Sequence, residues 1–423
     1  MTHFNIEGGY PLVGTIRIQG AKNAALPILA ATVLAEGVYE IRDVPRLSDI
    51  EVMIDILEAL GARITRIGHT IWVNTFHLNT SHIPHDLMRK MRSSIFLMGP
   101  LLSRLQEVCI SRPGGCAIGA RPIDLHLKGL QLLGSEIDER DGHILCRATM
   151  LQGAELTLEM PSVGATENLM MAAVKAEGTT VIRGAAREPE IVDLQSFLNN
   201  MGADIEGAGT NTIVVRGVKT LSPTSHTIIP DRIVAGTLMA AAAATQGEIT
   251  LQHAIAAHLD SFIQHLKETG TKIEYDEHTI WLRGLPQMSA VRRVATAPYP
   301  GFPTDLQPQM MVLLSLAQGS SLITESIFDA RLKHVDELKK MGAHMIAEQN
   351  SVRIRGVPQL YGAHVYATDL RAGAALVIAG LCAEGRTKVE GISHIDRGYE
   401  RLEEVFCQLG GKVDRSVAKI PLH

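Results

Sequence analysis

The apolar and polar residues of the chain form a pattern that repeats six times. Each repeat contains a segment of eight residues in which apolar residues at helical spacing are followed by a glycine. The octets are LEALGARI (57–64), LQLLGSEI (130–137), LNNMGADI (198–205), LKETGTKI (266–273), LKKMGAHM (338–345) and FCQLGGKV (406–413). Each glycine is expected just beyond the end of an amphipathic helix, as its C′ residue. Because the glycines recur every 68 to 73 residues, we interpret the chain as six copies of one unit.

A second marker lies about two dozen residues before most of the octet glycines. It reads AEGVYEI (35–41) in the first repeat and AEGRTKV (383–389) in the last, whereas the second repeat has RLQEVCI (104–110). Before the marker, stretches such as AALPILAATVLAEG (24–37) are apolar on all sides, which is typical of a buried helix. Alternating patterns predict strands at TIWVN (70–74), TIVVRG (212–217), TIWLRG (279–284) and SVRIRG (351–356).

The repeat predicts an α/β fold of two domains with three units each. Its period of about 70 residues exceeds that of common solenoids, so closed domains are expected. We place the first domain at residues 22–229 and the second at residues 1–21 with 230–423, because GTIRIQGAKN (14–23) resembles the strand that should complete the second domain. The cleft between two such domains is the expected ligand site.

Composition narrows the possible functions. Of 423 residues, 46% are hydrophobic and 4% aromatic, which predicts a core of Ala and aliphatic side chains. The formal net charge of -5 shows no basic excess, so nucleic acid is not an expected partner. The start, MTHFNIEGGYPLVG, has no leader pattern, and no apolar run is long enough for a membrane span. We therefore expect a cytoplasmic protein without membrane insertion, and nothing marks an oligomer interface.

Charged and polar residues recur at two places in the repeat. The first is the start of the buried helix, where free N–H groups and the helix dipole favour anions. It holds Lys22 and Asn23, Arg92, residues 162–164, Asp231 and Arg232, Thr304 and Asp305, and Asp369 with Arg371. The second is the loop after the first strand, with Cys116 and Arg121, Arg187 and Glu188, Arg331, and Arg397. These residues predict a phosphate site; the alternative is that Ser162, Asp231, Asp305 and Asp369 only cap helices.

Cys116 differs from the other cysteines of the chain. It lies in the Gly-rich segment RPGGCAIGAR (112–121), where nearby arginines are expected to lower the pKa of its thiol and favour catalysis. The other four, Cys109, Cys146, Cys382 and Cys407, lie in apolar segments and are predicted to be buried and inert. The odd cysteine count without a CxxC pair favours reduced thiols. The 17 histidines show no ligand spacing, so no metal site is predicted.

Six segments together resemble a known enzyme family. They are GAKNAALP (20–27), RPGGCAIGARPIDLHL (112–127), APYPGFPTDLQPQ (297–309), FDARLKHVDEL (328–338), TDLRAGAAL (368–376) and HIDRGYERLEE (394–404). This set resembles the UDP-N-acetylglucosamine 1-carboxyvinyltransferases of the EPSP synthase-like superfamily. The resemblance implies an inside-out α/β barrel of two pseudo-threefold domains. It also implies enolpyruvyl transfer from phosphoenolpyruvate to the 3′-hydroxyl of UDP-N-acetylglucosamine, the first committed step of peptidoglycan synthesis, without a cofactor.

The resemblance also implies roles for individual residues. Cys116 is the implied proton donor, a site of covalent adducts and the target of fosfomycin-type epoxides, and Asp305 is the implied proton acceptor. The implied catalytic set is Cys116, Asp305, Lys22, Arg397, Asp369 and Arg371. The implied phosphoenolpyruvate contacts are Lys22, Asn23, Arg121, Arg331, Arg371 and Arg397. Those for the nucleotide sugar are Asn23, Arg92, Arg121, Pro122, Ile123, Asp124, Leu125, Ser162, Val163, Gly164, Asp305 and Ile327.

The chain departs from the family pattern at three positions. Met160 and Pro161 stand where some members have Lys-Val, and Ser48 stands where some have Lys. Both changes remove positive charge from the expected diphosphate site. Two alternatives stay open at this point: the sister enzyme that uses shikimate 3-phosphate, and an inactive regulatory copy. The Gly-Gly-Cys loop argues against the first, and the complete set of charged residues argues against the second.

Overall fold

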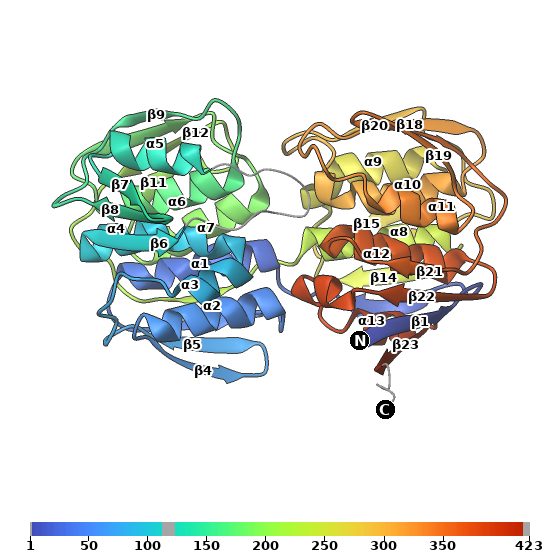
Figure 1. The fold of residues 1–423 in the computed structure, drawn as a ribbon, viewed down its shortest axis with the longest axis horizontal. Coiled ribbons are helices and arrows are strands. Elements are labelled where there is room, and N and C mark those ends of the chain that lie inside the picture. Colours follow the sequence, from blue (N-terminus) through green and yellow to red (C-terminus); the bar gives the residue numbers. More distant parts are fainter. Residues whose placement is uncertain (1, 112–122, 418–423) are drawn as a thin grey trace. The chain divides into compact units, whose positions relative to one another are not determined.

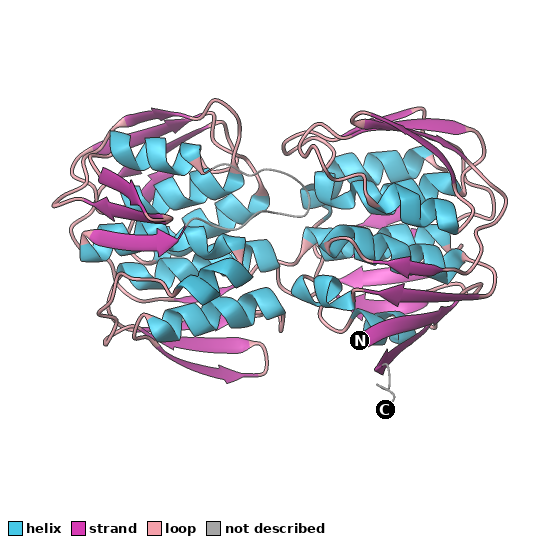
Figure 2. Ribbon diagram, viewed as in Figure 1, coloured by secondary structure: helices cyan, strands magenta, loops and turns pink. Residues whose placement is uncertain are grey.

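The computed structural model describes residues 2–111 and 123–417, which fall into two compact lobes. The N-terminal lobe comprises residues 20–111 and 123–229, and the C-terminal lobe comprises residues 2–19 and 230–417. Figure 1 traces both along the chain, and Figure 2 shows that in each lobe the sheets lie outside a group of helices. None of the helices in the described part of the chain combines the length and apolar character needed to cross a membrane.

The N-terminal lobe contains three sheets around three buried helices. The buried helices are α1 (Lys22–Ala31), α4 (Met98–Leu105) and α6 (Val163–Ala173). The amphipathic helices are α2 (Ser48–Ala59), α5 (Asp124–Leu132) and α7 (Pro189–Asn200). Three short helices complete the lobe: α3 (His85–Lys90), η1 (Thr32–Leu34) and η2 (Arg92–Leu97). In sheet order, the strands are β13 (Ser225–Thr227), β3 (Val38–Arg42), β5 (Thr70–Asn74) and β4 (Arg63–Ile67); β6 (Glu107–Ser111), β8 (His143–Arg147) and β7 (Glu136–Arg140); and β11 (Asp204–Glu206), β12 (Thr212–Arg216), β10 (Thr179–Arg183) and β9 (Glu155–Thr157).

The C-terminal lobe has the same plan. Its buried helices are α8 (Arg232–Ala244), α10 (Gln307–Ser315) and α12 (Leu370–Cys382), and the others are α9 (Asp260–Glu268), α11 (His334–Lys340) and α13 (Leu402–Gln408), with short η3 (Ala256–Leu259), η4 (Thr304–Leu306) and η5 (Ile392–Arg397). In sheet order, the strands are β15 (Lys272–Tyr275), β16 (Thr279–Arg283), β14 (Glu248–Gln252) and β2 (Val13–Arg17); β17 (Arg293–Ala295), β18 (Ser320–Thr324), β20 (Ser351–Arg355) and β19 (His344–Glu348); and β21 (His364–Tyr366), β22 (Arg386–Glu390), β1 (Thr2–Glu7) and β23 (Lys412–Val417).

The inside-out α/β fold class is confirmed, with helices within and sheets outside (Figure 2). The buried helices are mainly apolar because other elements cover most of their surface: α8 is buried throughout from Ile233 to Ala244. The four strands predicted from alternation are β5, β12, β16 and β20, which begin at the predicted residues. The N-terminal segment joins two sheets of the C-terminal lobe, because β1 pairs with β22 and β23 and β2 pairs with β14.

All six octet glycines end an amphipathic helix in a left-handed conformation, with φ between +89° and +102°. The first shows the hydrogen bonds that this turn satisfies. The Gly61 N–H donates to Glu58 O (2.9 Å) and the Ala62 N–H to Leu57 O (3.0 Å), which together form a Schellman motif. Glycine is needed here because a Cβ is strained at positive φ. The octet that recurs in the sequence therefore marks the same structure each time, a glycine turn that ends an amphipathic helix.

The surroundings of these glycines predict a graded cost of substitution. A Cβ at Gly134 would meet nothing within 4 Å, so Gly134→Ala should cost only the backbone strain, about 1–2 kcal/mol. A Cβ at Gly61 would lie 2.5 Å from His77 O, so Gly61→Ala should cost more. Urea unfolding of the two variants measures the difference. Equal losses of stability would show that backbone strain alone sets the requirement for glycine.

Candidate active site

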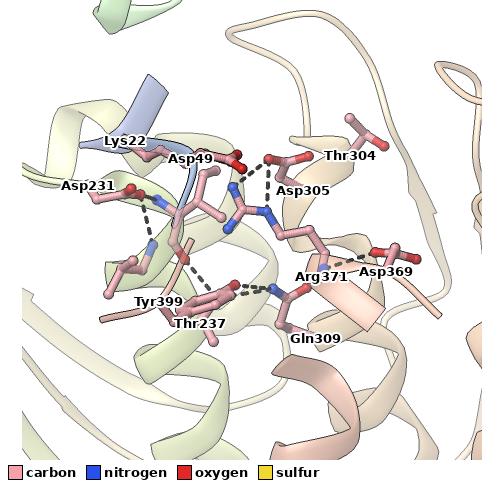
Figure 3. Close-up of polar contacts among 12 residues, drawn as sticks. Lys22, Asp49, Asp231, Thr237, Thr304, Asp305, Gln309, Asp369, Arg371 and Tyr399 are labelled. Atoms are coloured by element: carbon pink, nitrogen blue, oxygen red, sulfur yellow. Dashed lines mark hydrogen bonds and ion pairs between the residues drawn. The ribbon is translucent and has the colours of Figure 1, made fainter. Parts of the chain in front are cut away.

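Asp305 lies between two buried arginines of the C-terminal lobe. It belongs to η4, directly before the buried helix α10. Its Oδ1 accepts from Arg331 Nη2 (2.6 Å), and its Oδ2 accepts from Arg371 Nε (3.0 Å) and Nη2 (2.8 Å). Figure 3 shows the Arg371 guanidinium pointing at this carboxylate. The arginine side chains are 3% and 4% exposed and that of Asp305 is 25% exposed, so the carboxylate is the accessible member of the cluster.

The two arginines set the ionisation of Asp305. Burial by itself would raise the pKa of this carboxyl group, but the charges of Arg371 and Arg331 and their hydrogen bonds outweigh it. The pKa of Asp305 therefore lies well below its usual range. In this arrangement Asp305 is a strong hydrogen-bond acceptor and a weak proton acceptor.

Arg371 is fixed from its other side by a polar cluster inside the lobe. It is in the first turn of α12, and its guanidinium lies 5.4 Å from the centre of the Tyr399 ring. The Tyr399 hydroxyl bonds Thr237 Oγ1 on α8 (2.9 Å), and Gln309 on α10 donates to both hydroxyls (3.0 and 3.3 Å; Figure 3). Buried polar groups need such partners. The cluster thus connects all three buried helices of this lobe beneath Arg371.

Arg331 is fixed through a threonine and a buried glutamate. Its Nη1 donates to Thr304 Oγ1 (2.9 Å), and this hydroxyl donates to Glu325 Oε2 (2.8 Å). The Glu325 Oε1 accepts from the N–H groups of Ile327 (2.8 Å) and Phe328 (3.2 Å). Arg331 and Ile327, both predicted site residues, are therefore held by one carboxylate.

Three of the four residues considered as helix caps do cap a helix. Ser162 caps α6 by accepting from Ala165 N (3.3 Å), and Asp231 caps α8 through Ile233 N (2.9 Å). Asp369 caps α12 through the N–H groups of Arg371 (2.9 Å) and Ala372 (3.0 Å). Asp305 makes no such cap and is bound by arginines instead. Asp369 therefore positions Arg371 through its backbone.

Arg397 ends η5 and is half-buried. The residue before it, Asp396, accepts from Arg415 Nη1 (3.0 Å) and Nη2 (2.7 Å). The same guanidinium bonds Glu403 on α13 through Nε (2.6 Å) and Nη2 (3.0 Å). Bidentate pairs of this kind restrict both partners. Arg415, on β23, thus secures the segment that carries Arg397.

Lys22 begins α1 in the N-terminal lobe and is buried against Asp49 of α2, with Nζ and Oδ2 3.1 Å apart. A cation at a helix N-terminus opposes the helix dipole, and burial adds to that cost. The Asp49 carboxylate offsets both. The other predicted residues of this lobe also lie at helix starts: Asn23 in α1, Arg92 in η2, Ile123, Asp124 and Leu125 at α5, and Val163 and Gly164 in α6.

A buried histidine connects two of these helices. His126 on α5 bonds Asn168 on α6 (Nδ1 to Nδ2, 3.2 Å), and Asn168 Oδ1 accepts from Gly99 N of α4 (2.7 Å). A Cβ on Gly164 would lie 3.4 Å from the His126 ring. Burial and the nearby charge of Arg92 lower the pKa of His126 to about 4, so the ring is neutral at pH 7.

Cys116, Arg121 and Pro122 lie outside the described residues. The prediction that the other cysteines are all buried holds for Cys146 and is wrong for Cys407, which is exposed on α13 with Sγ 3.2 Å from Val413 O. Cys109 and Cys382 are partly buried. In FCQLGGKV the neighbouring Phe406 takes the inward position, so the next residue faces outward. The described residues contain no group of three His, Cys, Asp or Glu side chains that could hold a metal ion.

Comparison with known proteins assigns the family. Residues 6–406 match the family model described as EPSP synthase (3-phosphoshikimate 1-carboxyvinyltransferase). The UDP-N-acetylglucosamine 1-carboxyvinyltransferase 2 of Caldanaerobacter subterraneus subsp. tengcongensis is 54% identical over 98% of this chain and 100% of its own. The UDP-N-acetylglucosamine 1-carboxyvinyltransferase 1 of Carboxydothermus hydrogenoformans is 51% identical over 98% of each chain. The chain belongs to the UDP-N-acetylglucosamine 1-carboxyvinyltransferase family.

Solved structures agree with this assignment of a carboxyvinyltransferase, which is a transferase enzyme. The enolpyruvyl transferase NikO from Streptomyces tendae matches with a TM-score of 0.88 and 25% identity, covering 99% of each chain. EPSP synthase from Acinetobacter baumannii matches with a TM-score of 0.78 over 99% of this chain and 100% of its own. Its identity is 18%, so this likeness supports the fold only.

Four residues that support the predicted site residues were not predicted from the sequence: Glu325, Arg415, Asp49 and His126. Glu325 could have been found as an acidic residue that directly follows the strand SSLIT (320–324). Asp49 and Arg415 carry no such signal, because each lies in an ordinary polar pattern. Their partners are distant in sequence and meet only through the fold.

The buried histidine predicts a pH dependence of stability. The unfolded chain protonates His126 below about pH 6.5, whereas the native state resists protonation until about pH 4. Its contribution to the free energy of unfolding is therefore complete above pH 6.5 and is lost as the pH falls towards 4, by up to about 3 kcal/mol. Hydrogen exchange of the N-terminal lobe at pH 6.5 and 4.5, compared with that of His126→Gln, measures this contribution.

The comparison with the variant is necessary because Glu167 acts in the opposite direction. Burial raises the pKa of Glu167 well above its usual value, so its contribution fades as the pH rises. This effect is common to both proteins and cancels in the difference. Identical pH slopes for the native chain and His126→Gln would contradict the prediction.

Proposed function

We propose that this enzyme transfers the enolpyruvyl group of phosphoenolpyruvate to the 3′-hydroxyl of UDP-N-acetylglucosamine and releases phosphate. The observation that carries the proposal is an identity above 50% over nearly the whole chain to relatives named for that donor group and acceptor. The complete set of charged site residues supports it. The reaction would be the committed step of peptidoglycan synthesis in the cytoplasm, and hence a requirement for cell-wall growth, shape and division.

The proposed chemistry is addition followed by elimination. In the addition, the sugar oxygen bonds to C2 of phosphoenolpyruvate, its proton leaves to a base, and an acid delivers a proton to C3. In the elimination, C3 loses a proton and the bond from C2 to the phosphate oxygen breaks. Cys116 is the proposed acid, and its thiolate can also add to C2 and form a covalent adduct.

Asp305 would position the acceptor hydroxyl. Two guanidinium groups hold its oxygens and keep it ionised, which favours a directed hydrogen bond from a substrate O–H. The same charges make it a poor base until substrate binding changes the cluster. Orientation of the hydroxyl, which lowers the entropic part of the barrier, is therefore the principal proposed role of Asp305.

Phosphoenolpyruvate is a multiply charged anion, and the proposed contacts to it are cationic. Lys22, Arg121 and Arg397 would bind its phosphate and carboxylate, with Asn23, Arg331 and Arg371 completing the set. Asp49 and Arg415 would support Lys22 and Arg397 in this role. Asp369 would act through the backbone of Arg371.

The nucleotide sugar would use helix starts of the N-terminal lobe. Backbone N–H groups at the start of α6, at Val163 and Gly164, suit diphosphate oxygens. The start of α5 and Arg92 would add contacts, together with Arg121 and Pro122. Met160 is exposed just before α6, where a lysine would have added a charge.

Two alternatives are weaker. Transfer to shikimate 3-phosphate is suggested by the description of the family model, but the EPSP synthases among the solved structures share only 18% identity with this chain. An inactive copy has no need for the buried pairs that fix Arg331, Arg371 and Lys22. Burying charges for no purpose costs stability.

Phosphate release with alternative acceptors tests the proposed reaction. The purified protein with phosphoenolpyruvate should release phosphate when UDP-N-acetylglucosamine is added and none when shikimate 3-phosphate replaces it. Asp305→Asn should lower kcat by about a hundredfold or more, because the amide carries no negative charge and turns an NH2 group towards one of the two arginines. Turnover with shikimate 3-phosphate, or none with either acceptor, would refute the proposed acceptor.

The proposed acid predicts a specific chemical modification. An epoxide phosphonate of the fosfomycin type, incubated with the protein and UDP-N-acetylglucosamine, should alkylate Cys116 and abolish turnover. Mass spectrometry of the peptide that contains residues 113–121 identifies the adduct. The exposed Cys407 serves as the internal control for indiscriminate labelling. Labelling of Cys407 without Cys116 would count against a reactive Cys116.

A further inference from the structure

The repeats allow one site segment to be compared with its equivalents in the same chain. In four repeats the residue after the first strand has positive φ: Asp43 (62°), Gly184 (68°), His253 (54°) and, after β22 in the sixth repeat, Gly391 (73°). The neighbouring hairpin does not pair with the first three of these residues, because the N–H of the next residue donates to a carbonyl in the hairpin turn instead. These bonds are Val44 N to His69 O (2.8 Å), Ala185 N to Asn211 O (3.1 Å) and Ala254 N to His278 O (2.9 Å).

The fifth repeat lacks this bulge. Thr324 pairs with Ser351, and the next residue, Glu325, donates its N–H directly to Asn350 O (2.8 Å). Its φ is not positive. Glu325 therefore continues the alternation of β18 and takes the inward position that Val44, Ala185 and Ala254 take in the other repeats.

The fold itself is satisfied by an apolar residue at this position. Val44, Ala185 and Ala254 are buried there, with exposures of 0 to 1%, and Glu325 is 2% exposed. A carboxylate costs free energy in such a place unless several donors surround it. Glu325 thus breaks the repeat pattern next to Asp305, and its buried carboxylate needs several hydrogen-bond donors.

Those partners form two arms, one on each carboxylate oxygen. Oε2 accepts from Thr304 Oγ1 (2.8 Å), which in turn accepts from Arg331 Nη1 (2.9 Å) and so orients the guanidinium that binds Asp305. Oε1 accepts from the Thr296 hydroxyl (3.0 Å) and from the N–H groups of Ile327 (2.8 Å) and Phe328 (3.2 Å).

We propose that Glu325 is a positioning residue that aligns the acceptor sugar by fixing Asp305 through one arm and Ile327 through the other. The proposal rests on the proposed function, in which Asp305 and Ile327 contact the nucleotide sugar. It predicts that substitution of Glu325 affects the two substrates differently. Loss of the carboxylate should disturb the acceptor more than phosphoenolpyruvate, because Asp305 and Ile327 both face the acceptor whereas Arg331 is one of six proposed contacts to phosphoenolpyruvate.

Three substitutions test the two arms. Glu325→Gln can keep an oxygen towards Ile327 but turns an N–H group towards Thr304. Thr304→Val removes the first arm and Thr296→Val weakens the second, while Glu348→Gln, an exposed site on β19 of the same sheet, is the matched control. Steady-state phosphate release gives kcat and both KM values, and thermal unfolding reports stability.

Glu325→Gln and Thr304→Val should each lower kcat by about tenfold to a hundredfold, the effect of one hydrogen bond to a charged group. Thr296→Val should mainly raise KM for UDP-N-acetylglucosamine. The KM for phosphoenolpyruvate should stay within about threefold in all three. Because Glu325 and Thr304 act in series, the double variant should be no worse than the poorer single variant.

Other outcomes would overturn the proposal. Kinetic constants of Glu325→Gln equal to those of Glu348→Gln would show that the carboxylate has no role in turnover. Equal losses for both substrates, or additive losses in the double variant, would reduce Glu325 to a structural support. If Glu325→Gln does not fold, Thr304→Val and Thr296→Val carry the same test. An unmodified enzyme inactive with UDP-N-acetylglucosamine would refute the proposed function separately.

Discussion

One carboxylate held between two buried guanidinium groups is the constraint around which the C-terminal lobe is arranged. Arg331 and Arg371 are almost fully buried, and neither could remain so without Asp305. Their positions in turn require partners behind them, the Thr304 hydroxyl for one and the Tyr399 ring for the other. The lobe therefore accepts a costly set of buried charges, which leaves an ionised carboxylate that is accessible and fixed in direction.

The architecture makes such a cluster possible. Buried helices in the middle of a lobe bring their N-termini together, and the strands around them deliver loops to the same end. Asp305, Asp369 and Arg371 are at helix starts, whereas Arg331 comes from the loop after β18 and Arg397 from η5, which follows β22. A repeated unit thus supplies equivalent positions, and single repeats depart from the pattern where chemistry requires it.

Much of this could be predicted from the sequence because it depends on local patterns. The octet glycines mark helix ends, and alternation marks strands such as β5 and β16. Charged residues at helix starts indicated Asp305 and Arg371 as site residues. The pairing of Asp305 with two arginines, the brace that Arg415 forms and the neutral state of His126 depend on contacts across long stretches of chain. No local pattern encodes these contacts.

The placement of β1 has a consequence for how the chain is made. His3 pairs with both Glu390 and Ser416, so the first strand lies between two strands that are synthesised only after the N-terminal lobe. The described residues of the N-terminal lobe, by contrast, all lie between residues 20 and 229, so this lobe can complete its core while the later residues are still being made. During that interval the first strand has both hydrogen-bonding edges open. In this strand, buried Phe4 and Ile6 alternate with polar His3 and Asn5. One face of the strand is therefore polar, which limits association between nascent chains.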